Sequence, residues 1–322
     1  MQNLRLLLYP FSILYDGITS LRNYAFDKGV LEQREFDMPI IAVGNLSTGG
    51  TGKTPVIEYF IKKNQGLKIG VLSRGYGRKT SGYIELDVND TVEKVGDEPL
   101  QIKLKFKGLI VSAVCEKRVD GIDNLLKNHD LDLILLDDAY QHRHVKASHY
   151  VLLTSYGKLY KDDYLLPAGN LRESRSGANR AQTIVVTKCP LSISVEETLE
   201  IEKKLDLLPF QNLYFSYIAY DDFIYGNDVI KNLNDFKGLE VTVVTGIANP
   251  APFIEYLKKF ITVDHLKYND HHNFTNEEVE VIRSKEIVIT TEKDYARLRN
   301  FELGNVMYLP IQTKFIGKEP SL

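Results

Sequence analysis

The sequence has few cysteines and no excess of positive charge. Cys115 and Cys189 are its only cysteines, and they show no paired spacing of the kind found in metal sites. We therefore expect a reducing compartment and no structural disulfide. The formal net charge is −3, so the chain lacks the broad basic surface that binds nucleic acid. Hydrophobic residues make up 43% and charged residues 26% of the 322 residues, which indicates an ordinary globular protein.

Long apolar runs are also absent. The longest uncharged run near the start, Leu6 to Tyr15, is about half as long as a membrane-spanning helix requires. No small-residue cleavage site follows it, which argues against a signal peptide. Residues 1–30 are nevertheless rich in Leu, Ile, Tyr and Phe, with Arg5 and Arg22 among them. Two interpretations stay open: a helix packed on the core, or a helix on a membrane surface whose arginines meet anionic headgroups.

The best nucleotide-binding motif lacks one glycine. The phosphate-binding loop is written G-x-x-x-x-G-K-[ST], and "VGNLSTGGTGKTP" (Val43 to Pro55) matches its end but has Ser47 at the first glycine. Met38 to Asn45 is an apolar run typical of a buried strand, and the residues after Lys53 are apolar at helical spacing. This strand–loop–helix context predicts a true phosphate loop.

The remaining loop residues supply what phosphate binding needs. The glycines let backbone N–H groups turn toward an anion, and the helix N-terminus adds positive potential. Lys53 is placed to reach the terminal phosphates, and the Thr54 hydroxyl to ligate Mg²⁺. The residues predicted to bind the nucleotide are Gly49, Gly50, Thr51, Gly52, Lys53 and Thr54.

Further apolar runs predict the rest of a sheet. Continuous runs suit strands covered on both faces, as in a parallel sheet with flanking helices. We therefore expect an α/β fold with a P-loop NTPase-like, mostly parallel sheet, on which ligands bind at the carboxyl ends of strands. The runs lie at residues 67–77, 108–114, 131–141, 149–155 and 182–188.

Polar residues follow these runs. Asp137 and Asp138 end one run and are candidates to hold Mg²⁺ directly or through water. "VVTKCP" (Val185 to Pro190) imitates the guanine-binding motif N-K-x-D but lacks its aspartate, which favours ATP over GTP. Arginines that follow other runs, Arg74 among them, favour an anionic substrate, since the guanidinium group pairs well with phosphate.

Two acidic segments are candidates for proton transfer. "VGDEP" places Asp97 and Glu98 in a turn, which suits either a catalytic carboxylate or a plain turn. "NDHHNF" contains Asp270 beside His271. An Asp–His pair acting on a hydroxyl group is a better interpretation than a metal site, because no second ligand cluster has convincing spacing.

Eight of these segments occur in a characteristic order: "VGNLSTGGTGKTP", "SRGYG", "VGDEP", "LLDDAYQHR", "PAGNLRE", "TGIANP", "DHHNF" and "TEKD". Together they resemble the tetraacyldisaccharide 4'-kinases, the lipid A 4'-kinases of Gram-negative bacteria. The resemblance runs from about the N-terminal helix to about Asp294.

The resemblance implies a reaction and a location. ATP would phosphorylate the 4'-hydroxyl of a tetraacylated glucosamine disaccharide 1-phosphate, giving lipid IVA. The protein would act as a peripheral enzyme at the cytoplasmic face of the inner membrane, with the membrane surface and the lipid as its partners. This favours the membrane-surface interpretation of residues 1–30. Nucleic acid and an obligate protein partner are not expected.

The resemblance also implies roles for residues. Asp97 would be the catalytic base and His271 its partner, with Asp270 and Lys53 also in the catalytic group. Mg²⁺ would be held by Thr54 and by Asp137 or Asp138. The substrate-binding residues would be Arg74, Glu98, Arg118, Gln141 and Arg172.

The implied architecture is two lobes joined by a two-stranded linker. We place the linker at residues 213–227, whose aromatic-rich runs are typical of strands. Residues 1–30 would then form the membrane-surface helix, residues 31–212 the P-loop kinase core, and residues 228–322 the smaller C-terminal α/β lobe.

Two other classes of protein remain open. One is a partitioning-type switch ATPase, although that type normally has a lysine where this chain has Thr48. The other is an ATP-dependent ligase acting on a small soluble acid. ATP turnover with and without a lipid disaccharide separates them, because a switch ATPase should ignore the lipid.

Overall fold

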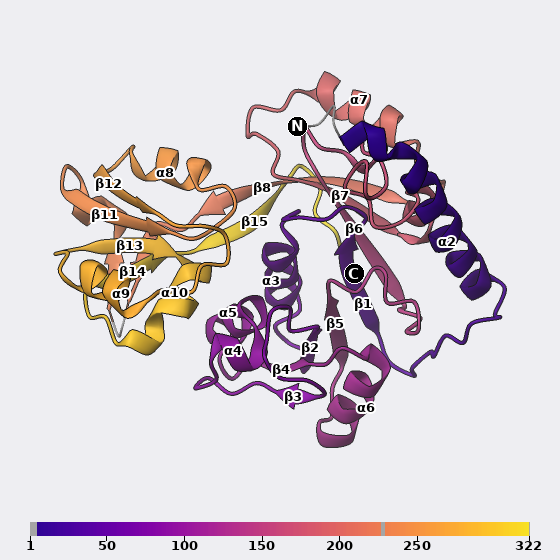
Figure 1. Ribbon diagram of the computed structural model, residues 1–322, viewed down its shortest axis with the longest axis horizontal. Coiled ribbons are helices and arrows are strands. Elements are labelled where there is room, and N and C mark those ends of the chain that lie inside the picture. Colours follow the sequence, from indigo (N-terminus) through magenta and orange to yellow (C-terminus); the bar gives the residue numbers. More distant parts are fainter. Residues whose placement is uncertain (1–4, 227–228, 322) are drawn as a thin grey trace.

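Buried apolar strands form the larger of two sheets in the computed structural model, which describes residues 5–226 and 229–321 (Figure 1). Within these residues the strand order is β15-β8-β7-β6-β1-β5-β2-β4-β3. The strands are β1 (Ile40–Asn45), β2 (Ile69–Ser73), β3 (Ile84–Glu85), β4 (Ile110–Val114), β5 (Leu133–Asp137), β6 (His149–Ser155), β7 (Thr183–Thr187), β8 (Asn212–Tyr220) and β15 (Ile311–Ile316).

The predicted apolar runs are confirmed as the parallel centre of this sheet. β1 pairs in parallel with β5 on one side and β6 on the other. Only β3 and β15, at the two edges of the sheet as described, run antiparallel to their neighbours. The predicted α/β class with a mostly parallel sheet is therefore confirmed.

Helices cover both faces of the larger sheet, as the alternation of side chains along β1 requires. Ile41 and Val43 pack with α3 and α5 in one core cluster, whereas Ile40 and Ala42 pack with α6 in another. The helices of this lobe are α3 (Lys53–Lys63), α4 (Val92–Val95), α5 (Asp97–Lys105), α6 (Arg118–Asn128) and α7 (Val195–Leu205), with short 3₁₀ turns η2 (Tyr160–Asp162) and η3 (Arg175–Arg180).

A second sheet forms the smaller lobe, with strand order β10-β9-β14-β13-β11-β12 in the described residues. Apolar clusters lie on both of its faces, one with α8 and the other with α9 and α10. Its elements are β9 (Phe223–Tyr225), β10 (Ile230–Asn232), η4 (Leu233–Phe236), β11 (Glu240–Thr245), α8 (Ala251–Leu257), β12 (Thr262–Lys267), α9 (Asn276–Arg283), β13 (Val288–Thr291), α10 (Glu292–Leu298), η5 (Arg299–Phe301) and β14 (Val306–Leu309).

The two strands that connect the lobes are far apart in the sequence. β8 runs from the larger lobe toward the smaller one, and β15 returns beside it as its antiparallel partner, with Ile316 opposite Phe215 (Figure 1). The predicted linker, residues 213–227, supplies only the first strand, because β9 belongs to the smaller sheet. Asn227 lies outside the described residues. We retain the division into lobes as a proposal, with residues 311–316 moved from the smaller lobe to the linker.

The N-terminal segment is helical, with η1 (Leu6–Leu8) followed by α2 (Tyr9–Asp27) along the outer side of the larger lobe (Figure 1). Residues 1–4 of the predicted helix lie outside the described range. Ser12 and Phe26 are buried against the core. Arg5 donates to the carbonyl oxygen of Pro167 over 3.1 Å, and Arg22 donates to that of Gln141 over 2.9 Å. Both arginines therefore contact the core, a difference from the expectation that they meet headgroups.

Candidate active site

The predicted phosphate loop joins β1 to α3 at the carboxyl end of the sheet. Gly49 and Gly52 have φ values of 104° and 85°, a region that favours glycine over residues with a Cβ. The first half of the loop is fixed by the backbone of Thr48, whose N–H donates to the carbonyl oxygen of Asn170 over 2.7 Å. The loop therefore keeps its shape although Ser47 replaces the first glycine.

The end of β7 supports the second half of the loop. The Thr187 hydroxyl donates to the carbonyl oxygen of Thr51 over 2.7 Å, and Lys188 Nζ donates to that of Gly50 over 2.6 Å. These are the first residues of the TKCP segment, which the sequence suggested only as an imitation of a guanine motif. Its contacts are with the loop backbone, a role that spacing in the sequence does not reveal.

Asp137 and Asp138 lie beside this loop at the end of β5. Asp138 pairs with Arg172 over 2.9 Å, and Lys53 Nζ lies 3.8 Å from its Oδ1. Burial acts to raise the pKa of Asp138, but the positive charges of Lys53 and Arg172 outweigh it and lower the pKa. This carboxylate is therefore kept ionised next to the lysine of the loop.

The pKa of Asp137 is shifted in the opposite direction from that of Asp138. Asp137 Oδ2 accepts a hydrogen bond from the Ser73 hydroxyl over 3.2 Å, while its buried Oδ1 has no partner among the described residues. Burial, followed by the charges of Glu98 and Asp138, raises its pKa to about 7. A buried carboxylate oxygen without a partner among the described residues, with the carboxylates of Glu98 and Asp138 near it, fits a site that a cation would complete.

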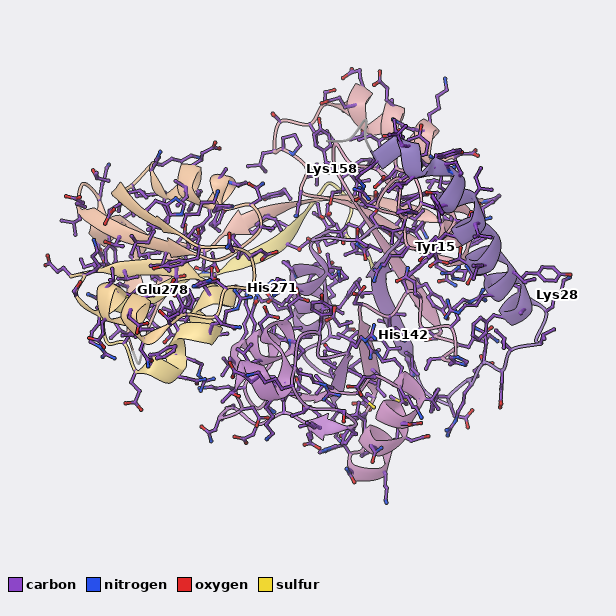
Figure 2. All side chains as sticks on the ribbon, viewed as in Figure 1. Tyr15, Lys28, His142, Lys158, His271 and Glu278 are labelled. Carbon is purple, nitrogen blue, oxygen red and sulfur yellow. The ribbon has the colours of Figure 1, made fainter. Side chains whose placement is uncertain are left out.

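The second predicted group is assembled across the two lobes. Asp97 is the first residue of α5 and is 5% exposed, so it opens a helix and does not sit in a plain turn. His271 Nδ1, from the smaller lobe, lies 2.9 Å from Asp97 Oδ2. Asp270 Oδ2 lies 3.9 Å from the other ring nitrogen of His271. Figure 2 shows His271 where the two lobes meet.

Two cations of α10 complete this group, and neither was among the predicted site residues. Arg297 donates to Asp97 Oδ2, and Lys293 Nζ lies 3.6 Å from the same oxygen. Lys293 also lies 3.1 Å from His271 Nε2. Burial acts to raise the pKa of Asp97, but Lys293 and Arg297 outweigh it, so the pKa falls below its usual 3.8. Lys293 belongs to the TEKD motif, and Arg297 lies one helical turn after it.

The predicted substrate-binding residues surround these two groups. Glu98 lies between them, 3.8 Å from Lys293 and close enough to Asp137 to raise its pKa. Arg118 is buried and donates to the carbonyl oxygen of Asp137 over 3.2 Å. Arg74 is exposed and close enough to Arg118 for its charge to lower the pKa of Arg118.

Gln141 and Arg172 converge on the end of β1. Both donate to the carbonyl oxygen of Asn45, over 2.9 and 3.0 Å. Helix α2 reaches the same place, since the Tyr15 hydroxyl donates to the carbonyl oxygen of Arg172 over 2.8 Å. Arg22, as described above, bonds the carbonyl of Gln141. The structure therefore brings the N-terminal helix into contact with predicted substrate-binding residues.

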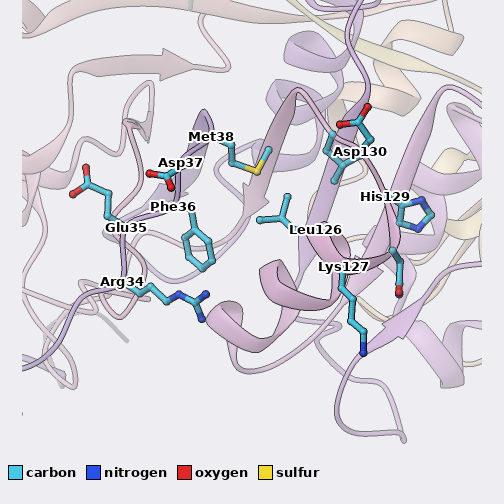
Figure 3. A pocket seen from close by; sticks show the side chains of 11 residues that line it. Arg34, Glu35, Phe36, Asp37, Met38, Leu126, Lys127, His129 and Asp130 are labelled. Carbon is cyan, nitrogen blue, oxygen red and sulfur yellow. The ribbon is translucent and has the colours of Figure 1, made fainter.

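A separate hollow of about 650 Å³ lies elsewhere on the larger lobe (Figure 3). It is lined by residues 34–38, before β1, and 126–131, before β5, so it lies at the amino ends of these strands. The phosphate loop lies at the carboxyl ends, and no predicted site residue lines the hollow. It therefore has no part in the site.

Residues 5–226 and 229–321 contain no cluster of three or more His, Cys, Asp and Glu side chains suited to a metal ion. The helices in those residues include none with the length and apolar character needed to cross a membrane.

The fold, with its phosphate loop between β1 and α3, is that of a P-loop kinase. The chain resembles a crystal structure described as the "apo" form of LpxK from Aquifex aeolicus in complex with ATP. The TM-score is 0.77 and the identity 27%, over 97% of this chain and 95% of that chain.

Sequence comparisons identify the family. The model of the Tetraacyldisaccharide-1-P 4'-kinase family matches residues 4–322. Tetraacyldisaccharide 4'-kinase of Flavobacterium johnsoniae is 50% identical, over 99% of this chain and 95% of its own length. Tetraacyldisaccharide 4'-kinase of Bacteroides thetaiotaomicron is 42% identical, over 97% of this chain and 89% of its own length. The chain belongs to the tetraacyldisaccharide-1-P 4'-kinase family, which confirms the predicted lipid kinase activity and the use of ATP.

Proposed function

We propose that this chain transfers the γ-phosphate of ATP to the 4'-hydroxyl of a tetraacylated glucosamine disaccharide 1-phosphate, at the cytoplasmic face of the inner membrane. The observation that carries the assignment of roles is the buried Asp97 carboxylate, held by His271, Lys293 and Arg297 of the smaller lobe. It belongs to the lobe that holds the phosphate loop, and Glu98 beside it acts electrostatically on Asp137. The proposed base for the acceptor hydroxyl thus lies near the residues that would bind ATP.

The donor half fits ATP with Mg²⁺. Gly49 to Gly52 would present backbone N–H groups to the phosphates, Lys53 would reach the terminal phosphates, and Thr54 with Asp137 or Asp138 would hold the cation. When bound, ATP supplies the transferred phosphate and Mg²⁺ reduces the repulsion between its oxygens.

The acceptor half controls a proton. Asp97 would accept the proton of the sugar hydroxyl as that oxygen attacks the γ-phosphorus of ATP, while the bond from this phosphorus to the β–γ bridging oxygen breaks and ADP leaves. Arg297 orients the carboxylate by donating to its Oδ2, and His271 Nδ1 lies 2.9 Å from the same oxygen; both residues come from the smaller lobe. Because a carboxylate with a lowered pKa is a weak base, most of the rate gain comes from positioning and charge neutralisation.

Helix α2 is proposed to lie on the membrane surface. Its inner face is bonded to the core by Ser12 and Tyr15, yet its outer face leaves large apolar side chains exposed. The exposed fractions on α2 are 63% for Phe11, 66% for Leu14, 62% for Ile18 and 69% for Leu21, and Leu7 of the preceding η1 is 74% exposed. Since Arg5 and Arg22 bond the core, apolar insertion dominates the binding and salt should release the protein only in part.

The identity of the phosphate acceptor is tested with radiolabelled ATP and the detergent-dispersed disaccharide monophosphate. We expect label in the lipid and ATP turnover that depends on it. Lipid-independent hydrolysis without lipid labelling would instead support a switch ATPase. Transfer to a small soluble acid would support a ligase.

A further inference from the structure

A buried ion cluster lies apart from the site residues described above. Lys105 Nζ donates to Glu58 Oε2 over 2.6 Å, to Glu292 Oε2 over 2.9 Å, and to the carbonyl oxygen of Ile311 over 3.0 Å. The Glu58 and Glu292 side chains are almost fully buried. Glu292 Oε2 also accepts the backbone N–H of Ile311 over 3.1 Å. One lysine therefore joins four separate parts of the chain.

Three of those parts are helices that each carry a group of the site. Glu58 lies on α3, which begins with Lys53 of the phosphate loop. Lys105 is the last residue of α5, whose first residue is Asp97. Glu292 is the first residue of α10, which carries Lys293 and Arg297. The fourth part, Ile311, begins the linker strand β15.

The contact between α5 and α10 therefore has an ion cluster at each end. At one end Asp97 of α5 meets Arg297 of α10, and at the other end Lys105 of α5 meets Glu292 of α10. Each helix carries one acidic and one basic residue, and each of these faces the opposite charge on the other helix. Neither helix can therefore slide along the other without separating opposite charges in a buried place. The pairing fixes one register between the lobes.

The cluster holds two carboxyl groups and one lysine. Burial, opposed by Lys105 and reinforced by Glu292, raises the pKa of Glu58 to about 7. Burial acts to lower the pKa of Lys105, but the two carboxylates outweigh it and raise the pKa. Lys105 is thus the shared cation on which the arrangement depends.

We propose that Lys105 is a positioning residue that sets the phosphate loop, the acceptor base and the smaller lobe in register for phosphate transfer. This inference rests on the roles proposed above for Lys53 and Asp97. Lys105 contacts neither of these residues nor the loop. Its effect is on the fraction of molecules in which the attacking oxygen and the phosphate are aligned, a geometry in which an error of about 1 Å costs roughly 10²-fold in rate.

The test uses a neutral form of the cluster, Lys105→Met with Glu58→Gln and Glu292→Gln. Lys105→Met alone would leave two buried carboxylates without a cation and could simply unfold the protein, whereas the neutral combination leaves no charge in this cluster. Lys105→Arg keeps the charge. The control is Lys146→Met, which breaks an exposed 2.9 Å pair with Glu35, a residue that lines the hollow at the amino ends of β1 and β5.

Two measurements are made on each form. One is kcat and both KM values with ATP and the lipid. The other is the distance distribution between spin labels at Lys127→Cys on α6 and Glu255→Cys on α8, which lie on exposed surface of different lobes. The native Cys115 and Cys189 are buried, which limits their labelling.

We expect the neutral form to lose about 10-fold or more in kcat, with each KM within about threefold and a broadened distance distribution. Lys105→Arg should recover most of the rate, and Lys146→Met should match the wild type. An unchanged kcat in the neutral form, or a lower kcat at an unchanged distance distribution, overturns the proposal. If the wild type does not phosphorylate the lipid, the proposed function fails instead, and the distance measurement still reports on the cluster.

Discussion

The two halves of the site are built in different ways. The ATP half is made of neighbouring residues, because Lys53 and Thr54 follow directly on the glycines that shape the loop. The acceptor half takes Asp97 from one lobe and its three partners from the other. Local backbone geometry is sufficient to form the first half. The second half forms only when the lobes meet in one arrangement, so changes far from the chemistry should affect it more.

The largest effect is expected for the local half. Lys53→Ala removes the loop cation that lies 3.8 Å from Asp138, so kcat for lipid phosphorylation should fall by roughly 10³–10⁵-fold, as for loss of a charge-stabilising group in phosphoryl transfer. Circular dichroism should show an unchanged fold. A well-folded variant with normal turnover would remove Lys53 from the site.

A smaller loss is expected at the shared half. Asp97→Asn should lower kcat by roughly 10²–10⁴-fold through loss of a general base. His271→Ala should lower it as well, and the double variant should be little worse than Asp97→Asn, because the two side chains act together. Steady-state kinetics on the three forms decide this, and additive losses would contradict a coupled pair.

The acceptor half should also depend on pH. Arg297 and Lys293 hold the pKa of Asp97 below 3.8, so its ionised form adds stability above the unfolded value and loses it as pH falls through the folded value. Arg297→Met removes one of the positive charges that lower this pKa, so the pKa should rise. The acid limbs of kcat/KM and of thermal stability should both move to higher pH. Arg297→Lys keeps the charge and should shift them less, and equal profiles for both variants would refute this account.

The smallest kinetic effect is expected for α2. Replacing Phe11, Leu14 and Leu21 with Ser removes exposed apolar area, about 1.5–3 kcal/mol for each side chain that would be fully inserted. Sedimentation with anionic vesicles should weaken, and the KM for lipid should rise while the KM for ATP stays the same. The control is Val30→Ser, an exposed apolar residue beyond the helix. If the triple variant sediments with vesicles as well as the wild type does, α2 only packs on the core and does not bind the membrane.

The sequence predicted the parts of the structure that depend on neighbouring residues. The parallel strands, the context of the phosphate loop and the helix after Lys53 were all readable from short apolar runs and their spacing. Their positions follow from burial and backbone preference, which act over a few residues.

Long-range pairings could not be predicted in the same way. The partner of β8 is β15, and nothing in residues 213–227 marks that choice. Lys293 and Arg297 contact Asp97 because α10 packs on α5, a contact that no local spacing encodes. Arg5 and Arg22 likewise turn inward because carbonyl acceptors of the core lie within their reach.

The pairing of β8 with β15 has a consequence for the order in which the protein forms during its synthesis. Residues 221–310 leave the ribosome after β8 and before β15. One edge of β8 therefore stays unpaired while the strands of the smaller sheet are synthesised. An unpaired edge strand is a template for association with other chains. Nascent chains that pause in this interval should therefore be the species most in need of a chaperone, because domains fold as units while their emerging neighbours are still incomplete.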